Sequence, residues 1–174
     1  MTRADVILRP ATLADVDVLT RWDSEPGVVA ASGDDDVADW TTELASQSAW
    51  YEVLIAELNG RPIGVVQIID PHHEVTHYWG EIETGLRAID IWIGEPEARG
   101  HGHGTAMMRA ALNRCFAPRD VTAVVIDPLE SNHRARRFYE RLGFVEVGPR
   151  QFGDDDCVVY RLERGDWEES SLRG

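Results

Sequence analysis

A glycine-rich segment at residues 99–105 has the composition of a phosphate site. It reads Arg-Gly-His-Gly-His-Gly-Thr and stands before a stretch with the apolar spacing of a helix. The first amides of a helix have no acceptor within the helix, and the helix dipole adds positive potential, so a helix start binds anions. Glycines let a phosphate approach the backbone closely. The segment therefore predicts a pyrophosphate site.

Two better-known phosphate loops fit this segment poorly. A Walker loop requires Gly-Lys-Ser/Thr, and the segment contains no lysine. A dinucleotide-binding fingerprint counted from Gly100 requires glycine or alanine where Thr105 stands. On its own, the segment leaves open a glycine-rich turn that binds no ligand.

A second candidate is Asp90, a carboxylate inside an apolar strand. Residues 86–94 alternate, with three isoleucines on one face and Asp90 and Trp92 on the other. Burying a carboxylate in a central strand is costly unless it is paired or lines a wet cleft. We therefore expect Asp90 to hold a cationic amine and to take or relay its proton.

Other acidic and aromatic residues could extend the site around Asp90. Glu81, Glu83 and Asp127 could complete an acidic pocket or could equally be solvated carboxylates. Trp79 and Trp92 could stack on a sugar ring or fill the core. The run at 154–156, three aspartates, predicts a solvated turn more than an acceptor contact.

The elements that must position these residues follow from apolar periodicity and turn signals. The pattern predicts α/β or α+β layers in a single domain, residues 1–174, with a core over about 6–162. The expected strands are 6–8, 51–58, 62–69, 86–94, 123–126, 144–147 and 158–162, and the expected helices are 12–22, 37–49, 105–116 and 131–142. Residues 70–85 are expected to form a loop.

The charge of the chain excludes some partners. Lys and Arg number 17 and Asp and Glu 31, a net charge of −14. This argues against a general nucleic-acid binder and against docking on an anionic membrane, and it favours cationic small molecules. Two cysteines make no disulfide framework, no apolar run is long enough for a membrane span, and Asp5 interrupts any signal-like start, so we expect a cytoplasmic protein.

One motif suggests a different chemistry. Residues 73–77 read His-Glu-Val-Thr-His, which binds zinc when both histidines lie on one helix. Here Pro71 and Gly80 bound a stretch that is too short and too β-branched to hold a helix alone. We expect no metal site, either here or at His101 and His103, and keep a zinc peptidase using His73, Glu74 and His77 as an alternative.

Three segments in order resemble the GNAT N-acetyltransferase superfamily. Arg-x-x-Gly-x-Gly at Arg99 to Gly104 resembles its acetyl-CoA signature. A buried strand ending in Asp127-Pro128 follows, and then a helix with Asn132 near its start and Tyr139 within it. The resemblance covers about residues 6–162.

Within the superfamily, residues 78–90 and 127–132 resemble the aminoglycoside 6'-N-acetyltransferases. In those enzymes the aromatic-acidic segment and the Asp of the Ile-Asp strand line the aminoglycoside pocket. This chain departs from them at Gly80 and Ile82, where they tend to carry a denser acidic run.

The resemblance implies the GNAT fold, a mixed, mostly antiparallel sheet flanked by helices, with a splayed pair of central strands. It implies acetyl-CoA as cosubstrate, Asp90 as the group that holds the amine, and Tyr139, whose ordinary pKa is about 10, as the acid that protonates the CoA thiolate. The implied donor site is Ile91, Trp92, Ile93, Arg99, Gly100, His101, Gly102, His103, Gly104, Thr105, Asn132 and Arg136. The implied acceptor site is Trp79, Glu81, Glu83, Asp90 and Asp127.

The resemblance also implies roles for these residues. The amides of residues 102–105 should bind the pyrophosphate, and Asn132 the pantetheine arm. An amide within residues 91–93, on a strand bulged away from its neighbour, should hold the thioester oxygen.

We therefore expect a direct, ternary-complex acetyl transfer to a primary amine, with the 6'-amine of an aminoglycoside as the leading acceptor and antibiotic resistance as its consequence. Other acceptors are a siderophore-type amine, a polyamine-like amine or a protein N-terminus. A non-catalytic CoA-binding module is the remaining alternative.

Overall fold

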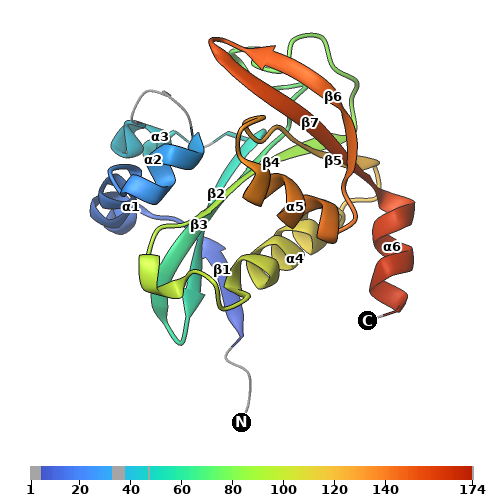
Figure 1. Ribbon diagram of the computed structural model, residues 1–174. Coiled ribbons are helices and arrows are strands. Elements are labelled where there is room, and N and C mark those ends of the chain that lie inside the picture. Colours follow the sequence, from blue (N-terminus) through green and yellow to red (C-terminus); the bar gives the residue numbers. More distant parts are fainter. Residues whose placement is uncertain (1–4, 33–37, 47, 174) are drawn as a thin grey trace.

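The sheet at the centre of the molecule is mixed. The computed structural model describes residues 5–32, 38–46 and 48–173, and within them a seven-stranded sheet has the order β1-β2-β3-β4-β5-β7-β6 (Figure 1). Neighbouring strands are antiparallel except β4 and β5, which are parallel. The strands are β1 (Val6–Pro10), β2 (Tyr51–Leu58), β3 (Arg61–Ile69), β4 (Leu86–Ile93), β5 (Ala123–Ile126), β6 (Val145–Phe152) and β7 (Asp155–Glu163).

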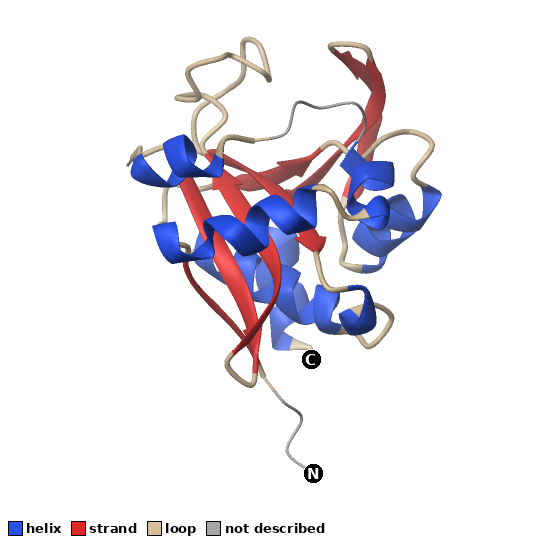
Figure 2. Ribbon diagram, turned by 90° about the vertical axis from the view of Figure 1, so that its left-hand side faces the viewer, coloured by secondary structure: helices blue, strands red, loops and turns tan. Residues whose placement is uncertain are grey.

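Helices cover both faces of this sheet (Figures 1 and 2). The first three lie on one side, α4 and α5 lie on the other, and α6 follows β7. The α-helices are α1 (Val16–Asp23), α2 (Pro26–Ser32), α3 (Trp40–Ala45), α4 (His103–Cys115), α5 (His133–Arg141) and α6 (Arg164–Leu172), with 3-10 turns at Leu13–Asp15 and Pro96–Ala98. None of the helices in the described ranges is long and apolar enough to cross a lipid bilayer.

Apolar alternation in the strands builds a core on each face. On the α4 side, Met107 and Leu112 pack with Leu54 and Val66. On the opposite face, a cluster that includes Trp22 and Trp40 covers β2 and β3. Farther along this second face, a separate cluster packs on β4, β5 and β7, formed by Trp79, Leu86, Ala88, Ala123, Val125, Phe152 and Cys157. The second face is thus covered by two separate hydrophobic clusters.

The central strands β4 and β5 pair only where they begin. Residues 86–88 pair with 123–125, and no register continues beyond them. On its other edge β4 stays paired with β3 as far as Ile93, opposite Gly64, without a break. The splayed pair is confirmed: β5 ends at Ile126, and β4 continues to Ile93 without pairing to it.

Local signals placed α4 and α5 correctly. Gly102 begins α4 with φ +83°, and the predicted apolar stripe of that helix is buried. Asn132 caps α5, and Gly143 follows its end at φ +96°, a left-handed position that favours glycine. Both helices therefore present apolar faces to the sheet.

Other predicted boundaries differ from the structure. The predicted helix 37–49 is shorter, because α3 spans only Trp40–Ala45, and residues 37 and 47 lie outside the described ranges. Helices α2 and α6 were not predicted, since each buries one side chain, Val28 or Trp167, and so shows no stripe. The closing strands β6 and β7 are longer than expected.

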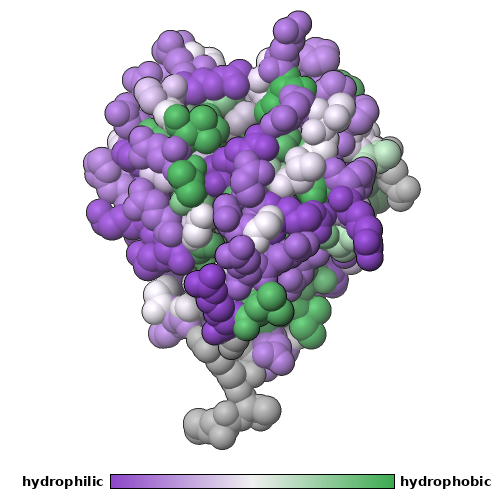
Figure 3. Space-filling view, turned by 90° about the vertical axis from the view of Figure 1, so that its right-hand side faces the viewer, coloured by the Kyte–Doolittle hydropathy of each residue, from purple (hydrophilic) through white to green (hydrophobic). Residues whose placement is uncertain are grey.

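One face of the molecule is mostly polar (Figure 3), in keeping with the charge of the chain. Figure 3 shows a largely hydrophilic face with hydrophobic side chains in small separate groups. The cysteines at 115 and 157 are both buried, and neither forms a disulfide within the described residues.

Candidate active site

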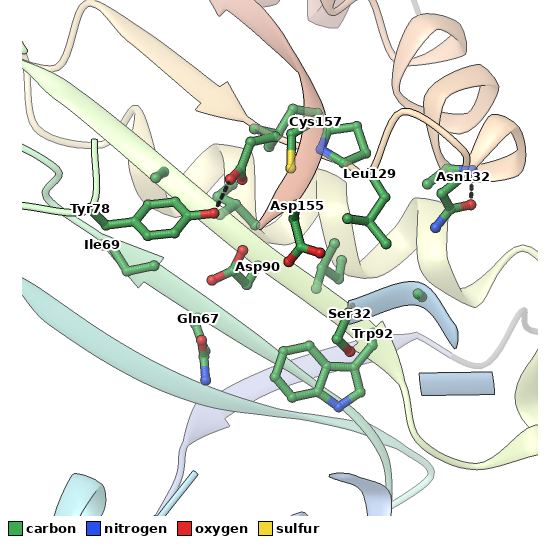
Figure 4. Close-up of a pocket in the computed structure, with 18 of the residues that line it drawn as sticks. Ser32, Gln67, Ile69, Tyr78, Asp90, Trp92, Leu129, Asn132, Asp155 and Cys157 are labelled. Atoms are coloured by element: carbon green, nitrogen blue, oxygen red, sulfur yellow. Dashed lines mark hydrogen bonds between the residues drawn. The ribbon is translucent and has the colours of Figure 1, made fainter. Parts of the chain in front are cut away.

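A cavity of about 680 Å³ opens where β4 and β5 diverge (Figure 4). Its walls come from α2, β3, β4, the loop at 70–85, the end of β5, the start of α5 and β7. Five carboxylates line it, those of Asp23, Glu74, Asp90, Asp127 and Asp155, and none of its described lining residues is Lys, Arg or His. The cavity is therefore built for a cationic ligand.

The carboxylates of the cavity differ in their surroundings. Glu74 accepts hydrogen bonds from the amides of Thr76 (2.6 Å) and Tyr78 (2.9 Å). Burial alone would raise the pKa of Glu74, but these bonds lower it below its ordinary value. Burial raises the pKa of Asp23, and a 2.6 Å bond from Trp40 Nε1 only partly offsets this. The carboxylates of Glu74 and Asp23 therefore hold parts of the cavity wall together through these hydrogen bonds.

Asp127 is oriented by Tyr78. The Tyr78 hydroxyl donates a 2.7 Å hydrogen bond to Asp127 Oδ2, drawn in Figure 4. The Tyr78 ring stacks on Phe152, with centroids 4.6 Å apart. Burial and the Asp127 charge raise the pKa of Tyr78 above its ordinary value, so this phenol stays a donor. In the same view Asp90 and Asp155 extend into the cavity beside this pair.

Tyr139 lines the same cavity from α5 and is 9% exposed. Burial, and then the negative charges of Asp90 and Asp127, raise the pKa of Tyr139 above its ordinary value. A phenol in these surroundings keeps its proton and can deliver it as an acid. The structure thus brings Asp90, Asp127 and Tyr139 to one cavity.

The glycine segment begins α4 as the sequence predicted. Gly100 and Gly102 have φ of +78° and +83°. Within the described residues, the helical hydrogen bonds of α4 begin where the amide of Ala106 donates to Gly102 O at 3.2 Å. A Cβ on Gly104 would meet side-chain atoms only at 3.8 Å. The amides of His103, Gly104 and Thr105 can therefore receive an anion, although the segment does not line the acidic cavity.

Strand β4 contributes both a donor side and an acceptor side. Ile91 and Trp92 line the cavity beyond the last residue paired with β5, so a ligand can reach the strand edge there. Trp79, also predicted for the acceptor, is 4% exposed and belongs to the core as well as the cavity wall. Ile93 packs with the α4 side of the core.

Two residues predicted for the acetyl-CoA site, Arg136 and Arg99, are hydrogen-bonded to other protein groups. Arg136 donates to the Tyr160 hydroxyl (3.0 Å), to Glu130 O (3.3 Å) and to Glu146 (3.3 Å). Arg99 donates to Ile93 O and pairs with Glu25. Asn132 does line the cavity, and its Oδ1 accepts from Ala135 N (3.1 Å) as the cap of α5.

Two predicted acceptor residues lie outside the cavity. Glu83 forms a 2.5 Å ion pair with Arg161, and Glu81 is exposed. Neither lines the acidic cavity, because the loop turns their side chains toward the surface. The expectation that Glu81 and Glu83 join Asp90 there does not match the structure.

The His-Glu-x-x-His motif is not helical. Residues 71–80 form successive turns, and His77 has φ +53°. His73 pairs with Asp70 at 3.0 Å, and Glu74 is bonded to amides. Its two histidines therefore do not share a helix face, which the zinc-peptidase chemistry requires.

Sequence reasoning missed three parts of the cavity. Asp155, assigned to a solvated turn, begins β7, is half-buried and lines the cavity. Gln67 of β3 also lines it. The alternation at 155–163 was a usable signal for Asp155, since it shares a face with Cys157. No periodic signal marked α2, which supplies another wall.

The chain is similar to known acetyltransferases over most of its length. A model of the acetyltransferase (GNAT) domain family matches residues 11–152. The aminoglycoside N(6')-acetyltransferase type 1 of Klebsiella pneumoniae is 30% identical over 173 residues, which cover 95% of this chain and 86% of that protein.

Solved structures show the same fold. The aminoglycoside acetyltransferase AAC(6')-Ib in complex with coenzyme A and kanamycin has a TM-score of 0.85 and 31% identity, over 96% of this chain and 99% of that one. AAC(6')-Ib with ribostamycin and coenzyme A has a TM-score of 0.85 and 29% identity, over 95% and 97%. Since the family model matches residues 11–152, most of the chain, the protein belongs to the GNAT acetyltransferase family.

Proposed function

We propose that this enzyme transfers the acetyl group of acetyl-CoA to a primary amine of a cationic small molecule, the 6'-amine of an aminoglycoside. The acidic cavity carries the proposal. Asp90, Asp127 and Asp155 line it without any basic lining residue in the described ranges, and polyamine sugars carry several ammonium groups to match them. Relatives named as aminoglycoside acetyltransferases support the same acceptor.

The chain offers a matching donor site. The helix start at residues 102–105 can hold a diphosphate, and Ile93 of β4, on the same strand as Asp90, lies 3.8 Å from the Cβ position of Gly104. When bound, acetyl-CoA supplies an activated acetyl thioester. In this proposal an amide of β4 beyond its pairing with β5 donates to the carbonyl oxygen, and Asn132, which lines the cavity, contacts the pantetheine arm.

The protein's groups then divide the proton work. Asp90 holds the ammonium form of the acceptor and takes or relays its proton, which leaves a neutral amine able to attack. Tyr139, which burial and neighbouring charge keep protonated, gives its proton to the departing thiolate, and the second proton that the nitrogen loses as the amide forms restores the phenol. Holding both substrates in one cavity supplies much of the rate by proximity. We also place the enzyme in the cytoplasm, where acetyl-CoA is available.

An amine panel tests the proposal. Thiol release from acetyl-CoA is measured with kanamycin, spermidine, a lysine derivative and a peptide N-terminus, and the site of acetylation is read by NMR of the product. We expect the highest kcat/KM with kanamycin and acetylation at the 6'-amine. A higher kcat/KM with spermidine or the peptide than with kanamycin would show that the aminoglycoside is not the preferred acceptor. Tight CoA binding with no turnover on any amine would favour a binding module.

A further inference from the structure

Arg99 makes contacts that do not belong to a phosphate site. Its Nε and Nη2 donate to the Ile93 carbonyl at 3.0 and 2.8 Å, and Nη2 also pairs with the Glu25 carboxylate. Both side chains are mostly covered, with 26% and 19% exposed. Ile93 ends β4 beyond the last residue that pairs with β5, and a covered carbonyl needs a donor. Arg99 supplies this donor to the Ile93 carbonyl, at a position where β5 no longer pairs with β4.

Glu25 connects this arginine to α2. Glu25 Oε2 also accepts from the amides of Gly27 (2.9 Å) and Val28 (3.1 Å), so one carboxylate caps the helix and holds the guanidinium. The Arg99 hydrogen bond, with these amides, lowers the pKa of Glu25 below its ordinary value. Gly27 lies directly on the guanidinium, since a Cβ there would be 2.4 Å from Arg99 Nη1. The start of α2 is therefore fixed against the end of β4.

Helix α2 is a wall of the acceptor cavity. Val28, Val29, Ala31 and Ser32 line it, and Figure 4 places Ser32 near Trp92. No residue of the segment 99–105 lines that cavity. Arg99 is the first residue of the Arg-x-x-Gly-x-Gly pattern. Its side chain is nevertheless connected, through Glu25, to helix α2 and so to the wall of the acceptor cavity.

We infer that Glu25 is a positioning residue for the acceptor: its ion pair with Arg99 holds α2 in place, and so sets the width of the cavity that receives the amine. The identity of the acceptor rests on the proposed function. The diphosphate is expected at the amides of residues 103–105, and the Arg99 side chain is bonded to Ile93 O and Glu25 instead, so CoA affinity should depend little on this pair.

The test compares Glu25→Gln, which removes the charge at constant size, with Glu97→Gln. Glu97 forms an ion pair with Arg61 in which both side chains are more than half exposed, and neither residue lines the cavity. Amide hydrogen exchange of the two variants and the wild type reports the order of α2 without any substrate. Steady-state kinetics with kanamycin and acetyl-CoA, and CoA titration by calorimetry, report function.

For Glu25→Gln we expect faster exchange confined to residues 28–32, and a KM for kanamycin raised at least about fivefold, with kcat and CoA affinity within about twofold of wild type. Glu97→Gln should change none of these. Unchanged exchange at 28–32, a uniform rise in exchange along the chain, or a loss of CoA affinity equal to the rise in kanamycin KM would overturn the inference. If the wild type acetylates no amine, the proposed function fails, and the exchange comparison still decides the role of Glu25.

Discussion

The Tyr78 hydroxyl and the Asp127 carboxylate, 49 residues apart in sequence, share a 2.7 Å hydrogen bond at the acidic cavity. The Tyr78 ring lies nearly parallel to Phe152 of β6, at an interplanar angle of 6°. One side chain thus connects the loop at 70–85 to the end of β5 and to the β6–β7 hairpin. The hydroxyl also fixes one oxygen of a carboxylate that lines the cavity with Asp90.

Tyr78→Phe should weaken acceptor binding without stopping the chemistry. The phenylalanine keeps the stack on Phe152 and loses the donor, and a hydrogen bond to a charged group contributes about 1.5 kcal/mol. We expect the KM for kanamycin to rise by about tenfold at most and kcat to stay within about twofold. Steady-state thiol release measures both constants.

A matched control is Tyr51→Phe. Tyr51 stacks on Trp50 and lines a different, smaller cavity, so the loss of its hydroxyl should leave the kanamycin KM unchanged. Equal KM changes in the two variants would show that the Tyr78–Asp127 bond has no particular role.

The centre of the fold could be predicted because its burial repeats with the period of each element. The stripe of α4 marks one buried face, and the structure buries it. In β4 the alternation holds in part, since Ile89 is buried and Ile91 and Ile93 are half-buried. Helices α2 and α6 could not be found in this way, because a single buried side chain in each leaves no period. Their positions depend on tertiary contacts such as Glu25–Arg99.

The site could be predicted only where the backbone itself determines it. Asp90 and the glycine segment follow from strand alternation and helix-start chemistry, and the structure places both as expected. The position of Glu83 depends on Arg161, and that of Arg136 on Tyr160, partners 78 and 24 residues away. Spacing within one segment carries no information about such pairs.

Gly104→Ala should weaken CoA binding without affecting the fold. A Cβ at Gly104 would stand 3.8 Å from Ile93 and Phe138, an ordinary contact, but it would occupy space beside amides that a phosphate must approach. We expect the Kd for CoA to rise at least about tenfold, with an unchanged thermal midpoint. Gly165→Ala, in α6 with no atom within 4 Å of the added Cβ, is the control. Equal CoA affinity in the two variants would place the diphosphate elsewhere.

Asp15 provides a test of pH-dependent stability. Its carboxylate is 5% exposed and accepts two 2.8 Å bonds from Arg9 and one from Thr12 N. The Arg9 bond lowers the pKa of Asp15 below its ordinary value despite burial. Its stabilisation is therefore present above the unfolded pKa, about 4, and is lost as pH falls through the lower folded value.

Asp15→Asn should accordingly lower the free energy of unfolding by about 2 kcal/mol at pH 7. The difference from wild type should stay constant from about pH 5 to 8 and shrink below about pH 4. Urea unfolding at several pH values measures it, with Asp17→Asn, an exposed neighbour, as control. A difference that grows on acidification would have the wrong sign for this ion pair.

Asp90→Asn should remove acetyl transfer and leave CoA binding intact. The amide keeps the shape of the side chain but can neither take a proton nor attract an ammonium group, and a general base contributes about a hundred- to ten-thousandfold. We expect kcat/KM for kanamycin to fall within that range and the Kd for CoA to change less than about twofold. Loss of CoA binding in this variant would instead mean that Asp90 maintains the strand geometry.

Tyr139→Phe should slow the chemical step and leave kanamycin KM nearly unchanged, because the phenol acts on the leaving thiolate. We expect kcat to fall by about a hundredfold. Since burial and the charges of Asp90 and Asp127 raise the pKa of Tyr139, its proton stays bound beyond the ordinary value of about 10. The wild-type kcat should therefore show no alkaline decline from this group up to about pH 10. An alkaline limb in kcat near pH 8 that disappears in Tyr139→Phe would contradict the protonated state, and an unchanged kcat would assign the proton to another donor.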